Sequence, residues 1–174
     1  MYSGSGGLLW KDYKIHGEYL GFILKDKYEP LKKIDITKIT REDSQSVVIL
    51  FSLVKRIREA LSGISYWKSS GDENTITGTD ALITKILLGT LGCTPAYDRF
   101  FKNGCRIFNS HSKNKIGPYT QFNAKSFLSL IEFYKENIKQ FSVASEVIEQ
   151  KLDMKYPQMK MIDMYFWQLG NSNS

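Results

Sequence analysis

Asp98 is the residue of this sequence whose type and position best suit chemistry. It follows Thr94 and Pro95, a pair that predicts the start of a helix, because Thr caps free backbone N–H groups and Pro suits the first helical position. The helix dipole and the free amides stabilise an ionised carboxylate there, so we expect Asp98 to accept a hydrogen bond from a backbone N–H or a basic side chain. Two interpretations are open: a structural carboxylate paired locally with Arg99 or Lys102, or a catalytic carboxylate at the mouth of a cleft.

Basic side chains follow Asp98 and form a candidate nucleic-acid-binding set. Its members are Arg99, Lys102, Arg106, Lys113 and Lys115. The stretch from Cys105 to Tyr119 contains Gly117–Pro118, which predicts an exposed basic loop. Aromatic residues are frequent nearby and at the end of the chain, and an exposed subset of them would suit stacking on bases beside phosphate contacts. We therefore expect DNA or RNA as a partner.

The segment around Asp98 resembles part of a known enzyme superfamily. The stretch ITKILLGTLGCTPAYDRFF is similar to the helix–loop–Asp segment of the helix-hairpin-helix DNA glycosylases, and the closing IDMYFWQLG resembles the last helix of uncharacterised all-helical bacterial proteins. The resemblance implies that Asp98 assists expulsion of a flipped base and that phosphate-binding glycines fall near Gly78. The hairpin signature L-x-G-x-G is absent, and Asp80 stands nearest to the position of the family's lyase lysine. The hypothesis is therefore a glycosylase-like, nucleic-acid-binding architecture in which the activity itself is left open.

Two other functions stay open from the sequence. Arg106 and His111 form an R-x₄-H pattern that is similar to the catalytic motif of HEPN-type ribonucleases, in which Arg and His from two protomers cleave RNA. Ile107 follows the Arg, where that family usually has a polar residue. The other alternative is a cytoplasmic protein-interaction module without a catalytic centre, which binds a protein partner or a second copy of the chain through an exposed apolar patch.

Composition bounds these hypotheses. The 174 residues suit one domain with a sizeable core, and 42% apolar and 24% charged residues are ordinary for a globular protein. The net charge of +6 permits a polyanionic partner without requiring one, because the Lys residues are spread along the chain. We expect no membrane span and no signal peptide, since neither long apolar run nor basic start is visible. Cys93 and Cys105 suit neither a disulfide framework nor a zinc site, which favours reduced thiols in the cytoplasm, and no cofactor pattern is present.

Apolar residues recur at three- and four-residue spacings, which predicts an all-α protein: a single compact domain of six to seven helices over residues 1–170, with a disordered tail over 171–174. The predicted helices lie at 19–24, 43–62, 80–91, 95–104, 123–138, 143–152 and 157–169, and the stretch 65–77 is predicted to be a surface loop. Their boundary signals include Thr40 with Asp43, Gly63, Thr79, Gly92 and Asn123. We further expect the helices at 80–91 and 157–169 to pack together and to bury Leu87, Leu88, Ile162 and Phe166.

Overall fold

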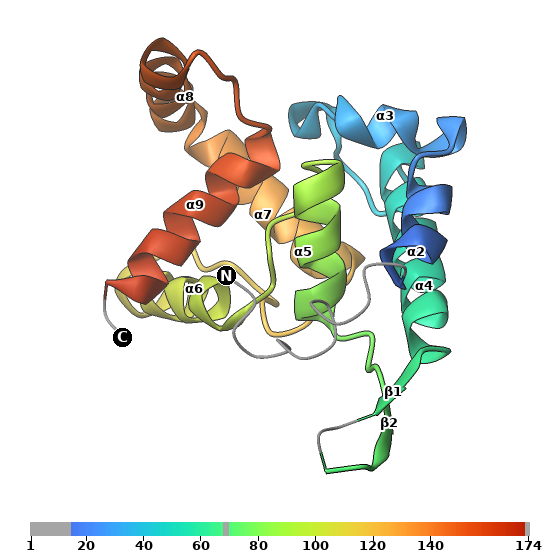
Figure 1. Ribbon diagram of the computed structural model, residues 1–174. Helices are drawn as coiled ribbons and strands as arrows, with labels where there is room; N and C mark the ends of the chain where they lie inside the picture. Colours follow the sequence, from blue (N-terminus) through green and yellow to red (C-terminus); the bar gives the residue numbers. More distant parts are fainter. Residues whose placement is uncertain (1–14, 68–69, 173–174) are drawn as a thin grey trace.

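The computed structural model describes residues 15–67 and 70–172, and in these ranges the chain forms eight α-helices (Figure 1). They are α2 (Ile15–Ile23), α3 (Glu29–Lys32), α4 (Gln45–Ser62), α5 (Asp80–Thr90), α6 (Arg99–His111), α7 (Ala124–Glu136), α8 (Ile138–Leu152) and α9 (Gln158–Asn171). The all-α prediction is confirmed, although the number of helices is one more than the expected maximum. The additional helix is the short α3, which has Pro30 in its first turn.

The predicted surface loop after α4 instead contains a small β-hairpin. Strand β1 (Ser65–Trp67) pairs antiparallel with β2 (Glu73–Thr75), and the hairpin projects away from the helices in Figure 1. Two short 3₁₀ turns, Asp26–Tyr28 and Ile36–Lys38, connect the first helices. These pieces are incidental to an architecture that is otherwise helical.

Local signals account for several helix boundaries. Thr79 caps α5 by accepting a hydrogen bond from the N–H of Leu82 at 3.3 Å, and Gly92 follows α5 with a positive φ of 65°. Gly63 is the C-cap of α4, as predicted. The helix start predicted from Thr40 and Asp43 is wrong, because α4 begins only after Ser44, whose side chain makes no cap hydrogen bond.

The largest correction concerns α6. Thr94 and Pro95 do not start a helix: both are buried in the segment before it, where the Thr94 hydroxyl lies 3.3 Å from the carbonyl of Thr84. Helix α6 begins at Arg99 and continues through Gly104 to His111. The first seven residues of the predicted basic loop, 105–111, are therefore helical.

Gly104 is a packing site rather than a helix stop. A Cβ atom at Gly104 would collide with the backbone of Phe166 in α9, and one at Gly170 would collide with the backbone of Phe100 in α6. The close approach brings the ring of Phe166 to 5.6 Å from the ring of Phe101. The closest partner of α9 is thus α6, and not α5 as predicted.

The remaining helices follow α6 around the same core. Asn123 and Ser126 form a capping box at the start of α7, which confirms Asn123 as a cap. Helix α8 begins at Ile138, directly after the break at Asn137, so Ile138 is 41% exposed and not part of the apolar face of α7. Leu87, Ile162 and Phe166 are fully buried as predicted, whereas Leu88 is only half-buried.

The end of the chain departs from the predicted disordered tail. Helix α9 extends to Asn171, with Ser172 as its C-cap, while residues 173–174 lie outside the described ranges. Among the described helices, none combines the length and the apolar character that crossing a membrane requires.

Candidate nucleic-acid interface

Asp98 caps α6 and joins it to α5. Its Oδ1 accepts a hydrogen bond from the N–H of Phe101 at 3.0 Å, and its Oδ2 lies 3.1 Å from the Nζ of Lys85. The side chain is 15% exposed. The expected bond to a backbone N–H or a basic group is therefore present, but the basic partner is Lys85 and neither Arg99 nor Lys102. Both carboxylate oxygens are engaged by protein groups, which is the arrangement of a structural cap.

A second carboxylate, which the sequence analysis missed, holds the segment before α6. Asp163 of α9 is 5% exposed, and its Oδ1 accepts a hydrogen bond from the N–H of Ala96 at 2.9 Å. Its Oδ2 lies 3.0 Å from the Nζ of Lys160. Burial raises the pKa of Asp163, while the Ala96 amide and the Lys160 charge oppose that rise. Only the i,i+3 spacing to Lys160 is visible in the sequence, since the contact with Ala96 is long-range.

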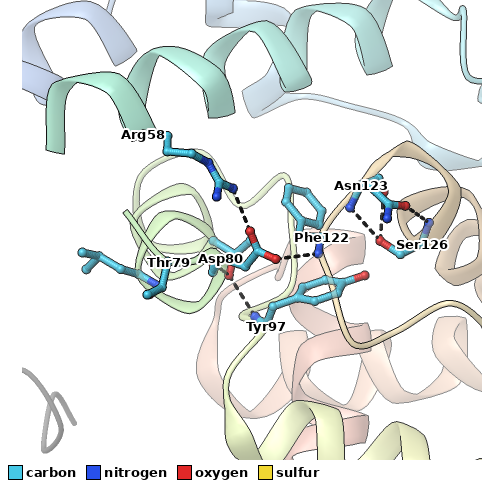
Figure 2. Close-up of polar contacts among 9 residues, drawn as sticks. Arg58, Thr79, Asp80, Tyr97, Phe122, Asn123 and Ser126 are labelled. Atoms are coloured by element: carbon cyan, nitrogen blue, oxygen red, sulfur yellow. Dashed lines mark hydrogen bonds and ion pairs between the residues drawn. The ribbon is translucent and has the colours of Figure 1, made fainter. Parts of the chain in front are cut away.

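Asp80 forms a third junction, shown in Figure 2. Its Oδ1 lies 2.7 Å from Nη2 of Arg58 in α4, and its Oδ2 accepts the N–H of Phe122 at 2.8 Å. The hydroxyl of Thr84 donates to the carbonyl of Asp80 at 2.6 Å and accepts the N–H of Tyr97 at 2.8 Å. Asp80 therefore ties α4 and α5 to the segment before α7 and gives a structural account of this position.

Gly78, near which the glycosylase resemblance places phosphate-binding glycines, is buried between β2 and α5. A Cβ atom there would lie 3.2 Å from the Cα of Arg58, so this glycine allows a close approach of α4. The chain that precedes it is the β-hairpin, which ends at Thr75.

The structure brings the predicted basic residues of α6 onto one side of the helix. Arg99, Lys102 and Arg106 are three and four residues apart, the spacing that places side chains on a common helical face. Arg99 and Arg106 are exposed and Lys102 is half-buried. Lys113 and Lys115 are exposed in the segment that follows the helix. We call these five residues the α6 surface.

The charge of this region is unusual for the chain. Residues 99–131 contain six Lys or Arg and no Asp or Glu, whereas the rest of the chain contains 18 of each kind, so the whole net charge of +6 falls in this segment. Within the described ranges, ion pairs with carboxylates involve basic residues outside it. The Lys residues are indeed spread along the chain, but the acidic residues are absent from 99–131, so a count of acidic residues along the sequence was the signal that could have found this surface.

Aromatic side chains border the α6 surface at its start. The guanidinium of Arg99 lies over the ring of Phe100, 4.7 Å from the ring centre. The Phe100 ring in turn lies 5.6 Å from Trp167 of α9, whose side chain is 38% exposed. By contrast, Phe101 and Phe166 are fully buried in the core. The structure thus separates the core aromatic residues from the half-buried Phe100 and the exposed Trp167 beside Arg99.

Arg106 and His111, the R-x₄-H pair, both lie on α6 rather than in a loop. A helix turns by about 100° per residue, so side chains five residues apart point about 140° away from each other. The guanidinium of Arg106 is held by the side-chain oxygen of Asn103 at 2.7 Å, and Nδ1 of His111 lies 2.9 Å from the carbonyl of Ile107. The two side chains therefore do not converge within one chain.

The two cysteines are buried away from this surface. Burial raises the pKa of Cys93 to about 12 and also raises the pKa of Cys105, so both stay protonated at neutral pH and are poor nucleophiles and ligands. Within residues 15–67 and 70–172, the side chains that commonly bind metals do not gather in a group of three or more.

Comparisons with protein-family models, with curated proteins and with solved structures give no match to this chain.

Proposed function

We propose that this protein binds nucleic acid through the α6 surface and performs no base excision. The observation that carries the proposal is the segment 99–131, which holds the whole net charge and whose described Lys and Arg side chains form no ion pair with a carboxylate. Cations that no carboxylate neutralises can contact phosphates and release the counterions condensed on a nucleic acid, which favours binding.

The arrangement of the basic groups supports contact with phosphates. Asn103 holds the guanidinium of Arg106 through bonds of 3.2 and 2.7 Å from Nε and Nη2, which leaves the other edge of the planar group free to donate. Lys113 and Lys115 supply compact charges on the adjoining segment. In this proposal Asp98 is the cap that sets where α6 begins and not a catalytic group, because protein donors occupy both of its oxygens.

The test is a salt-dependent binding measurement with a charge-matched control. We expect fluorescence anisotropy with labelled DNA and RNA oligonucleotides to show affinity that falls steeply with salt, by about 0.7 to 0.9 in log K per log[salt] for each phosphate contact. Replacing Arg99, Arg106 and Lys113 together by Gln should weaken binding about 30- to 100-fold and reduce the slope by about 2.

The control removes the same charge elsewhere. Lys139 and Lys151 of α8 and the following Lys155 are exposed and form no ion pair, so their joint replacement by Gln should change affinity less than about threefold. Binding that is undetectable, insensitive to salt or equally weakened by both triple variants would overturn the proposal.

A second candidate function is protein interaction, and an exposed apolar pair on α8 favours it. Val143 and Val147 lie one helical turn apart and are 62% and 44% exposed, and Phe141 is the buried residue of α8. Figure 1 places α8 away from α6, so this surface is distinct from the basic one. Sedimentation at increasing concentration tests for a second copy of the chain: replacing Val143 and Val147 by Ser should abolish any self-association.

A further inference from the structure

The aromatic border of the α6 surface has the features of a stacking platform. Trp167 leaves more than a third of its side chain exposed, and its ring contact within the described residues is the edge-on contact with Phe100. Arg99 covers part of the Phe100 ring and is itself exposed. Cationic and aromatic groups are therefore continuous at this point, from Arg99 through Phe100 to Trp167.

Tyr165 shows that exposure alone does not produce this arrangement. It lies two residues before Trp167 on α9, which turns the two side chains about 160° apart around the helix. Although Tyr165 is 43% exposed, its ring packs against Phe133, Phe141 and Phe166. Trp167 is thus the exposed aromatic residue of α9 that faces the start of the basic helix.

We propose that the ligand of the α6 surface is single-stranded nucleic acid, with an unpaired base stacked on Trp167 and the adjoining phosphates held by Arg99, Lys102 and Arg106. This inference rests on the proposed function. Bases within a duplex are already stacked on their neighbours, so an indole at the surface can accept only a base that is free to turn out. Single-strand binding sites combine a basic track with aromatic side chains in this way.

The dimensions indicate a short site. Arg99 and Arg106 are seven residues apart, which separates their Cα atoms by about 10 Å along the helix axis. Trp167 stands at the Arg99 end of this row, next to Phe100. The stacked base therefore lies at one end of the bound segment, and the phosphates that follow it run along α6 toward Lys113.

The experiment compares three probes of equal length: oligo-dT, the same strand with abasic sites throughout, and a duplex. We expect wild-type protein to bind oligo-dT roughly tenfold more tightly than the abasic strand, since stacking on one base contributes on that order. Trp167→Leu should remove this difference by weakening oligo-dT binding alone, with an unchanged salt slope. Trp167→Phe should retain part of it, and an oligo-rU arm reports whether RNA or DNA is preferred.

Two further variants separate stacking from charge. Tyr165→Leu removes an exposed aromatic ring on the other side of α9 and should leave all three affinities within about twofold. Arg106→Gln should weaken binding to every probe and lower the salt slope by about 0.7 to 0.9. Thermal melting verifies that each variant is folded, and the comparison of probes on wild-type protein decides the question without any variant.

The outcomes distinguish this inference from the proposed function. Equal affinity of wild-type protein for oligo-dT, the abasic strand and the duplex would overturn single-strand stacking while leaving nucleic-acid binding in place. Equal weakening of dT and abasic binding by Trp167→Leu would also overturn it. Failure to bind any of the three probes would instead refute the proposed function and, with it, this inference.

Discussion

The two sides of helix α6 differ in burial and in charge. One side buries Phe101, Gly104 and Cys105, and there the helix approaches α9 so closely that Gly104 has no room for a side chain. The other side carries Arg99 and Arg106, which are exposed and form no ion pair. Because packing uses one set of residues and charge uses another, stability and binding should respond to separate substitutions. Substitutions on each side of the helix test that separation.

Phe166→Ala removes a ring that packs against the buried side of α6 and should lower the free energy of unfolding by about 3–5 kcal/mol. The ring is fully buried and contacts the rings of Phe101, Phe108 and Phe133, so its loss leaves a cavity between α6 and α9. Urea unfolding monitored by circular dichroism measures the change. A loss below roughly 1 kcal/mol would show that this side of α6 is not tightly packed.

Gly104→Ala should cost about 2–3 kcal/mol, because the added methyl group must push the backbone of Phe166 away. Gly89 is a matched control, since it also lies within a helix but has open space around it. Gly89→Ala should be neutral or stabilise the protein by up to about 1 kcal/mol. Equal effects of the two substitutions in thermal unfolding would contradict the close contact of α6 with α9.

Asp98→Ala should lower stability by about 1–2 kcal/mol, because it removes the cap of α6 and leaves the N–H of Phe101 without its acceptor. Asp98→Asn retains a capping oxygen and should cost less. Unfolding measurements on both variants rank the two effects. If Asp98→Asn preserved stability and nucleic-acid binding but abolished release of a base from DNA, the catalytic interpretation would replace the structural one.

Replacing Asp163 should change how the free energy of unfolding depends on pH, in a direction that its raised pKa predicts. Its pKa is raised by burial from the ordinary 3.8, so the folded chain holds a proton that the unfolded chain has lost, and stability falls as the pH rises through the folded pKa. Relative to the wild type, Asp163→Asn should therefore gain stability as the pH rises from roughly 3 to 7. Unfolding curves across this range give the slope.

Replacing Asp35 should change the pH dependence of stability in the opposite direction, which makes it an internal comparison. Hydrogen bonds from Thr37 lower the pKa of Asp35, so its contribution to stability is present above the unfolded pKa and is lost as the pH falls. Asp35→Asn should accordingly lose stability relative to the wild type as the pH rises. The same direction of change for both Asn variants would contradict the assigned environments.

The smallest expected effect belongs to the exposed side of α6. Replacing Arg99, Arg106 and Lys113 by Gln should change the free energy of unfolding by less than about 0.5 kcal/mol per site, since no ion pair is lost. The same variant is the one expected to lose nucleic-acid binding. A large destabilisation measured in urea would mean that the two sides of α6 are not separable.

Helix content and several helix ends could be predicted from the sequence because their causes are local. Thr79 and Asn123 bond to amides three residues away, and Gly63 and Gly92 follow helices that they help to end. The candidate site was predicted in part, because residue type and spacing are visible in the sequence: Arg99, Lys102 and Arg106 were identified as basic residues near Asp98. That these three residues share one face of a helix became clear only from the structure, in which α6 continues through residues 105–111.

Contacts between distant residues decided the rest. Gly104 has the appearance of a helix stop in the sequence, but the backbone of Phe166, 62 residues further along, turns it into a packing site inside α6. In the same way Ala96 bonds to Asp163 and Asp98 pairs with Lys85, so the segment before α6 is held in place by α9 and α5. The sequence alone therefore predicted the all-α class and the positions of most helices, because capping and periodicity act within a few residues, but it missed the short α3 and the helical residues 105–111. Only the tertiary structure decided which side of α6 is buried and which side exposes its charge and Trp167, because close packing depends on residues that the chain brings together from afar.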